Sequence, residues 1–186
     1  EQSLERTQRK RPDLLAWAQL TDEDRRTLQR LAGEEKSSSA ERMWARLVRY
    51  HKRYKRRAYS VWSFGSGPEE ADELSSLVRR GIKKATASAL ELYEHRGEPV
   101  PQPGDLSVIL DGSGEAACVI ETVSVSILPF DEVTEEFAAL EGEGDRSLAH
   151  WKAVHEGFFQ KEYAAEGLAF STGIPVVCEE FRVIFR

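Results

Sequence analysis

The feature that most constrains the fold is a pair of β-rich segments joined by a short turn. Leu106 to Leu110 and Ala116 to Ile127 are rich in apolar and β-branched residues, which favour strands. Between them lies Asp111-Gly-Ser-Gly114, whose glycines can adopt the positive φ that tight hairpin turns require. We therefore expect an antiparallel pair of strands at the centre of the fold.

Patterns typical of helices and of strands lie on either side of this hairpin. Residues 68–80 repeat apolar side chains at helical spacing, with Pro68 in the first turn and Gly81 after the end. The same reasoning predicts four further elements: a strand over 60–64, helices over 131–140 and 147–166, and a strand over 176–185. The mixture predicts an α+β fold.

The N-terminal third differs from the rest of the chain in pattern and in charge. Residues 1–57 hold 16 Lys and Arg against 9 Asp and Glu, a net charge of +7, whereas the remainder carries −13. Apolar spacing predicts helices over residues 12–33 and 41–57. We therefore predict a basic, α-helical N-terminal extension over residues 1–59 and an acidic domain over residues 60–186.

The second of these helices has an apolar face and many basic side chains. Met43, Trp44, Leu47 and Tyr54 form the face, and Lys or Arg occupies most other positions up to Arg57. Basic and aromatic side chains together can bind phosphates and stack bases, as in proteins that bind single-stranded RNA. The alternative is a helix that docks on its own acidic domain. Docking is marginally favoured.

Composition narrows the cellular setting. No segment approaches the ~20 consecutive apolar residues of a membrane-spanning helix, and the charged N-terminal part has no apolar segment like that of a signal peptide. We expect a cytoplasmic protein with no membrane partner. Cys118 and Cys178 lie within apolar runs and are expected to be reduced core residues.

A first group of chemically useful side chains follows the helix that ends at Gly81. The glycine lets the chain turn tightly, so Lys83, Thr86 and Ser88 are expected to point outward. A lysine near a hydroxyl can act as general base and nucleophile, or the two can hold a phosphate. The alternative is a helix C-terminus whose lysines complement the helix dipole.

A second group lies ahead of the last long helix. Glu141, Glu143 and Asp145 supply three carboxylates and Arg146 a guanidinium, with glycines between them. Such a loop could bind a divalent metal ion, or hold a ligand phosphate with Arg146. The structural alternative is that Asp145 or Ser147 caps the helix.

Aromatic residues near these groups have two interpretations. Trp151, His155, Phe158 and Phe159 fall near helical spacing and could line a base-binding wall, but core packing is the favoured interpretation. Tyr93 follows the Lys–Thr segment closely and could border the same cleft.

Several ordered motifs lie between Trp62 and Leu148. They are Trp62-Ser-Phe-Gly65, Ala71-Asp-Glu-Leu74, Gly81-Ile-Lys-Lys-Ala-Thr-Ala-Ser-Ala-Leu90, Gly104-Asp-Leu-Ser-Val-Ile-Leu-Asp-Gly112, Phe130-Asp-Glu-Val-Thr-Glu-Glu-Phe-Ala138 and Glu141-Gly-Glu-Gly-Asp-Arg-Ser-Leu148. In these motifs the chain from Val61 onward resembles the ASCH family of the PUA-like superfamily.

The resemblance implies a small β-barrel surrounded by helices, with a cleft suited to RNA or a modified nucleoside. Activities attributed to such proteins include ribonuclease and N4-acetylcytidine amidohydrolase, and the catalytic Lys, Thr and Glu of the amidohydrolases match Lys83, Thr86 and Glu141. Thr86 would attack the acetamide carbonyl, Lys83 would accept its proton at a pKa lowered by partial burial, and Glu141 would orient the lysine. Four further residues are expected to contact the substrate: Trp62, Ser88, Tyr93 and Arg146.

Two departures from the amidohydrolase pattern affect the expected reaction. Lys84 stands where many relatives have Thr, and Ser88 stands where the small amidohydrolases carry Arg. A second lysine would lower the pKa of Lys83 further, or favour phosphate over an uncharged amide. Ser88 and the 141–147 segment follow the longer ASCH subfamily, which is associated with cleavage of single-stranded RNA. Ribonuclease therefore ranks first, ahead of amidohydrolase and of a non-catalytic RNA-binding module.

Overall fold

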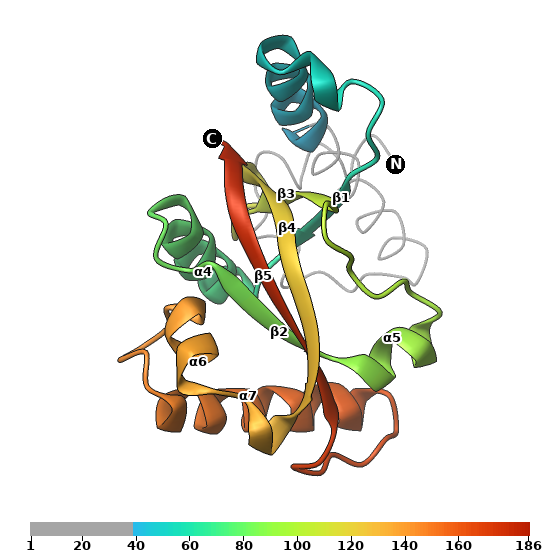
Figure 1. Ribbon diagram of the computed structural model, residues 1–186, viewed down its shortest axis with the longest axis vertical. Helices are drawn as coiled ribbons and strands as arrows, with labels where there is room; N and C mark the ends of the chain where they lie inside the picture. Colours follow the sequence, from blue (N-terminus) through green and yellow to red (C-terminus); the bar gives the residue numbers. More distant parts are fainter. Residues whose placement is uncertain (1–38) are drawn as a thin grey trace, which may run out of the picture.

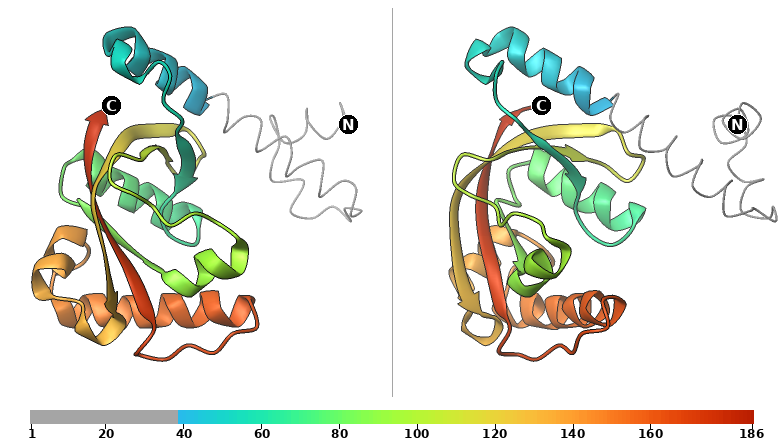
Figure 2. Two further views of the ribbon diagram at one scale, coloured as in Figure 1. Left: turned by 45° about the vertical axis from the view of Figure 1, so that its right-hand side comes forward. Right: turned by 90° about the vertical axis from the view of Figure 1, so that its right-hand side faces the viewer.

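The structure, a computed structural model, describes residues 39–186 and is built on one curved five-stranded sheet (Figure 1). Its strands are Ser60–Ser63 (β1), Ala85–Ala89 (β2), Leu106–Leu110 (β3), Ala116–Pro129 (β4) and Pro175–Phe185 (β5). Their order is β1-β3-β4-β5-β2; β1 runs parallel to β3, and the other neighbours are antiparallel. The sheet curls into a half-barrel with helices around it (Figure 2). The predicted α+β fold and barrel-like sheet are confirmed.

The predicted hairpin is also confirmed and extends further than expected. β3 and β4 are antiparallel, with Ile109 opposite Cys118, and Gly114 in the turn has a φ of 83°. β4 continues to Pro129 and pairs with β5 along most of its length. Register shifts at Val119 and Thr122 interrupt this pairing, and such bulges bend and twist a sheet. The curvature follows from these irregularities.

The helices around the sheet begin and end at residues suited to those positions. α4 (Pro68–Arg79) has proline at its start, and α5 (Leu90–Arg96) ends at Gly97 in the left-handed conformation. α6 (Glu135–Glu141) and α7 (Leu148–Ala165) begin after Thr134 and Ser147, whose side chains accept backbone hydrogen bonds. None of the helices in residues 39–186 is long and apolar enough to cross a membrane.

Two predicted elements differ from the structure. The helix expected over 131–140 is divided into the 3-10 helix Phe130–Glu132 (η2) and α6, because Val133 is extended and Thr134 starts a new helix. The segment after Gly81 was expected to be a turn, but its second half forms β2 and is followed directly by α5. β2 is alanine-rich, and it is a strand because it pairs with β5, with Ala87 opposite Cys178.

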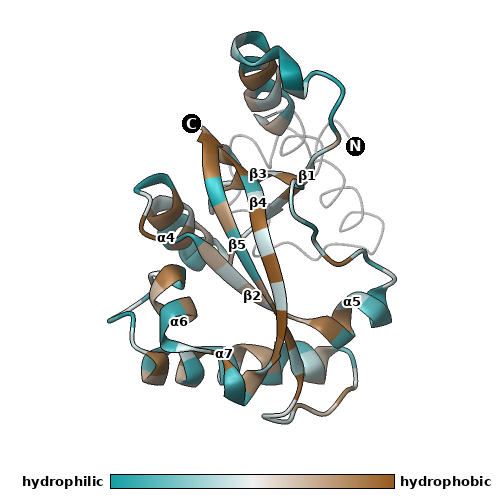
Figure 3. Cartoon of the chain, viewed as in Figure 1, coloured by the Kyte–Doolittle hydropathy of each residue, from teal (hydrophilic) through white to brown (hydrophobic). Residues whose placement is uncertain are grey.

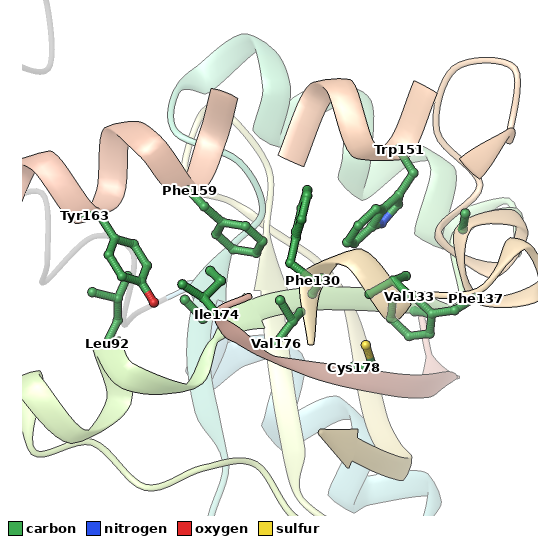
Figure 4. Close-up of a cluster of buried hydrophobic side chains, with 14 residues drawn as sticks. Leu92, Phe130, Val133, Phe137, Trp151, Phe159, Tyr163, Ile174, Val176 and Cys178 are labelled. Atoms are coloured by element: carbon green, nitrogen blue, oxygen red, sulfur yellow. The ribbon is translucent and has the colours of Figure 1, made fainter. Parts of the chain in front are cut away.

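The main core lies between the sheet and α7. Trp151, Phe159 and Tyr163 of α7 pack with Phe130 and Val176 in one buried cluster, shown in Figure 4. Cys118 and Cys178 are buried free thiols, as expected, and burial raises their pKa values to about 11 and about 12.

A helix over residues 39–50 packs on the sheet far from α7 (Figure 1). It carries hydrophobic and hydrophilic residues side by side (Figure 3). Met43, Leu47 and Tyr54 are buried in a cluster with Val108 of β3 and Val119 of β4. The docking interpretation is therefore confirmed for the apolar face of this helix.

Three other predictions concern the N-terminal extension. The helix expected up to residue 57 stops at residue 50, and Lys52–Tyr54 form a 3-10 helix (η1). The helix expected over 12–33 lies outside the described residues. The domain boundary proposed near residue 60 stays a prediction.

Leu47 offers a direct test of this packing, because its side chain is fully buried between the helix and the sheet. Leu47→Ala is expected to lower the free energy of unfolding by about 2–5 kcal/mol, measured by urea denaturation. Arg49→Ala, at an exposed position two residues away, should change it by less than about 0.5 kcal/mol. Equal effects of the two substitutions would contradict the docked arrangement.

Candidate functional site

The site begins with a lysine that points into the protein. After α4, Gly81 turns the chain with a φ of 72°, and the backbone N–H groups of Ile82 and Lys83 both bond back to the carbonyl of Leu77. Lys83 is only 2% exposed, whereas the adjacent Lys84 is exposed. The expectation that Lys83 points outward is therefore wrong, because the turn folds it back under the helix end.

Two glutamates hold the lysine. The Lys83 ammonium donates to Glu141 Oε2 at 2.5 Å and to Glu143 Oε1 at 2.6 Å. Glu141 is 1% exposed, and its second oxygen accepts a hydrogen bond from Trp151 Nε1 at 2.9 Å. His155 stacks on Trp151 and brings Nε2 within 3.4 Å of the same oxygen. The partners of Glu141 thus come from two segments, the turn after α4 and the helix α7.

Gly142 makes this arrangement possible. It follows Glu141 at the end of α6 with a φ of 73°, and a Cβ there would lie 2.7 Å from the carbonyl oxygen of Ile82. A side chain at this position would therefore push the end of α6 away from the turn that carries Lys83. The glycine lets the two loops touch.

Burial and charge act in opposite directions on this cluster. Burial alone would lower the pKa of Lys83, but Glu141 and Glu143 outweigh it and raise that pKa above its ordinary value. Burial would raise the pKa of Glu141, yet Lys83 and His155 lower it to about 2. Lys83 is therefore an ammonium at neutral pH, and the expected lowered pKa is wrong. A fixed cation can stabilise a developing negative charge but cannot accept a proton.

Two adjoining cavities open beside the cluster. The first, the Lys83 cavity, has a volume of about 490 Å³ and is lined by Lys83, Glu141, Glu143 and Thr86 among others. The second, of about 550 Å³, contains Glu179 in its lining and is called the Glu179 cavity. They share five wall residues: Phe64, Gly65, Thr86, Ala87 and Phe158. The two cavities therefore adjoin along this wall, and together they are called the cleft.

Thr86 lies where the cavities meet. It is half-buried in β2, opposite Glu179 of β5. Within residues 39–186, no hydrogen-bond partner is found for its hydroxyl group. The predicted trio of Lys83, Thr86 and Glu141 thus lies around one cavity, and its catalytic role stays a prediction.

Three of the four expected substrate contacts line the Glu179 cavity. The Ser88 and Tyr93 hydroxyl groups lie 2.9 Å apart, and Trp62 forms part of the wall. Arg146 does not join them: it is exposed, has a left-handed φ of 63°, and lies outside the lining of both cavities.

The structure adds site residues that the sequence did not single out. Glu179 is buried, and its Oε1 accepts a hydrogen bond from Thr122 at 2.6 Å. Burial raises the pKa of Glu179, against the lowering effect of the Thr122 hydrogen bond. The sequence did contain a signal for a buried glutamate here. Glu179 and Glu180 are adjacent in a strand, where neighbouring side chains point to opposite faces. One of the two had to face the interior. Phe158 and His155, assigned to the core, also line the cleft.

The lining of the cleft is acidic. Four carboxylates line the Glu179 cavity: Glu98, Asp105, Glu162 and Glu179. Among the described residues, its lining contains no Lys or Arg. Four more carboxylates line the Lys83 cavity: Glu70, Glu73, Glu141 and Glu143. Its described lining contains two lysines, Lys83 and Lys161.

The acidic loop does not fit the divalent metal ion considered above. Glu141 and Glu143 each direct an oxygen to Lys83, and Asp145 is exposed and bonds Ser147 as part of the helix cap. Over the part of the chain that the structure describes, no group of three or more His, Cys, Asp or Glu side chains could hold a metal ion.

The sequence profile of the ASCH domain matches residues 60–185. The chain belongs to the ASCH domain family. This family has a PUA-like fold associated with RNA binding. A search of curated proteins found no significant match.

Two solved structures resemble the ASCH chain closely. The ASCH domain from Lactobacillus crispatus JV V101 is 31% identical, with a TM-score of 0.76 over 80% of this chain and 96% of that one. A protein from Enterococcus faecalis V583 is 33% identical, with a TM-score of 0.72 over 80% of this chain and 94% of that one. Because 80% of the chain exceeds the span of residues 60–186, both matches include part of the sequence before residue 60.

The paired glutamate makes the stability of this ASCH domain depend on pH. The pKa of Glu141 is about 2 in the folded protein, against an ordinary 4.5, so its stabilising effect is present above about pH 4.5 and is lost as pH falls toward 2. Glu141→Gln should flatten this acid-side loss, measured as the urea midpoint between pH 2 and pH 7. Glu94→Gln, at an exposed position, should leave the curve unchanged. An unaltered slope in Glu141→Gln would contradict the pairing.

Proposed function

We propose that this ASCH domain hydrolyses an uncharged amide on a modified nucleoside of the N4-acetylcytidine type. The charge of the cleft carries this proposal. Lys83, at the end of the Lys83 cavity, is already matched by Glu141 and Glu143, and Lys84 lies outside the lining. A phosphodiester there would face an excess of carboxylates, which repel it, whereas a neutral amide would not. Lys84 does not line this cavity and therefore gives no reason to expect a phosphate there.

The proposed chemistry gives each group one task. Thr86 Oγ1 attacks the acetamide carbonyl carbon, and its proton passes to a carboxylate. Glu143 is suited to that step, because its side chain is 20% exposed and reaches the cavity, whereas that of Glu141 is 1% exposed. The Lys83 ammonium stabilises the oxyanion of the tetrahedral intermediate.

Collapse of the intermediate completes the reaction. The bond from the carbonyl carbon to the base nitrogen breaks, and that nitrogen takes the proton back from Glu143. An acetyl ester on Thr86 remains. A water molecule gives a proton to the same carboxylate and attacks the ester carbonyl carbon; the bond from that carbon to Thr86 Oγ1 then breaks, acetic acid leaves, and Thr86 Oγ1 takes the proton from Glu143. Glu141 holds Lys83 and does not touch the substrate.

A second candidate is cleavage or binding of single-stranded RNA, favoured by a basic segment beside the cleft. Lys52, Lys55 and Arg56 are exposed. The next residue, Arg57, donates to the carbonyl of Gly104 at 2.6 Å, and both Ser60 and Asp105 line the Glu179 cavity. RNA phosphates could lie on this segment while one base enters the acidic cleft.

Thr86 distinguishes the two reactions. Thr86→Val keeps the shape of the side chain and removes the nucleophile, so turnover of N4-acetylcytidine should fall by at least about a thousandfold, with the melting temperature little changed. Thr86→Ser should retain measurable turnover. Lys84→Met, beside the cluster but outside the cleft, should behave as wild type.

The substrates are assayed separately, each with and without Mg²⁺ or Mn²⁺. Normal hydrolysis of N4-acetylcytidine by Thr86→Val would remove Thr86 from the mechanism. Cleavage of single-stranded RNA by a wild-type protein that leaves N4-acetylcytidine intact would replace the amidohydrolase proposal with ribonuclease.

The basic segment has its own test. Replacing Lys52, Lys55 and Arg56 with alanine should weaken RNA binding and lower the log–log salt slope by roughly 0.7 for each phosphate that these side chains no longer neutralise. Turnover of the free nucleoside should not change, because these side chains lie outside the cleft. An Arg80→Ala, Lys84→Ala double variant serves as the control. An unchanged salt slope in the triple variant would exclude this segment as the RNA-binding surface.

A further inference from the structure

The Glu179 cavity has an unused hydrogen-bond acceptor in its wall. Glu179 is 7% exposed, and its Oε1 is bonded by Thr122. Within residues 39–186, its Oε2 has no hydrogen-bond partner, yet every fully enclosed polar side-chain atom there does have one. Oε2 therefore reaches open space, and the open space that Glu179 borders is this cavity.

The rest of the lining narrows the chemistry of a ligand. The hydroxyl groups of Ser88 and Tyr93 lie on one wall, and Trp62 and Phe158 offer aromatic surface. The described lining has no cation to match a phosphate. A ligand group that suits this cavity is therefore neutral and donates a hydrogen bond to the buried carboxyl group of Glu179.

The position of Thr86 indicates which part of a nucleoside enters this cavity. The step rests on the proposed function, in which the scissile amide lies at Thr86 on the side of the Lys83 cavity. In a cytosine the amide nitrogen and the sugar are attached at opposite sides of the ring. A ring placed along the shared wall at Phe64 and Phe158 therefore directs the sugar into the Glu179 cavity.

We propose that the Glu179 cavity is a ribose pocket, in which Glu179 Oε2 accepts a hydrogen bond from a sugar hydroxyl group. Carboxylates bind ribose hydroxyls in this way in dinucleotide-binding proteins. Thr122 acts as a positioning residue, because its hydroxyl fixes the other oxygen of Glu179. The pocket makes the domain select a ribonucleoside over a free base.

Calorimetric binding of unmodified ligands tests the pocket without relying on hydrolysis. The wild-type protein should bind cytidine at least about tenfold more tightly than cytosine, the effect expected of a hydrogen bond to a charged group. Either 2′-deoxycytidine or 3′-deoxycytidine should lose most of that advantage, which identifies the hydroxyl. Glu179→Met should remove the preference for cytidine, and Glu180→Met, the neighbouring exposed glutamate, should keep it.

Failure of this inference is distinct from failure of the amidohydrolase proposal. Ribose-dependent binding of cytidine without any amide hydrolysis would support the pocket and overturn the reaction. Hydrolysis of N4-acetylcytidine and N4-acetylcytosine with equal KM would support the reaction and overturn the pocket. Wild-type binding that does not distinguish cytidine from cytosine, or no binding of cytidine, would also overturn the pocket, whether or not Glu179→Met folds.

Discussion

A buried ammonium between two carboxylates is the constraint on which the rest of the site depends. Removing such charges from water costs several kcal/mol per ion unless pairing and hydrogen bonds compensate. Lys83 meets that condition only if the turn after α4 and the end of α6 converge on it. Glu141 in turn needs α7, whose Trp151 donates to its second oxygen. One charge thus fixes three segments, and Gly142 removes the side chain that would keep two of them apart.

Sequence reasoning succeeded where patterns were long and local. The β3–β4 hairpin, α4 and α7 have repeats of several residues and turn or cap residues at their ends, so propensity and structure agree. It failed at β2, because alanines do not favour a strand by themselves and the residues of β5 that pair with β2 lie about 90 residues away in the sequence. Small side chains suit that place, since β2 is covered by α6 and the main core.

The same distinction applies to the site. Motifs that resemble the ASCH family singled out Lys83, Thr86 and Glu141, and the structure brings the three around one cavity. No local signal told whether Lys83 points in or out, since its burial depends on Glu141 and Glu143, about 60 residues away. The pKa of Lys83 was wrongly expected to be lowered for the same reason. Burial without Glu141 and Glu143 would lower this pKa, whereas burial beside them raises it. Glu179 was detectable only through strand alternation.

The net charge of the whole chain conceals a separation of basic and acidic side chains in the structure. The N-terminal helix buries its apolar face against β3 and β4, so docking accounts for that face and leaves basic side chains outward. Acidic side chains line the cleft, and the basic segment from Lys52 to Arg57 joins the sheet at its edge. A polyanion is therefore attracted to the border of the cleft and repelled from its interior. Under the proposed function, a ligand that satisfies both would keep its phosphates outside and insert a neutral base, so that a base modification, rather than the backbone, would meet Lys83 and Thr86.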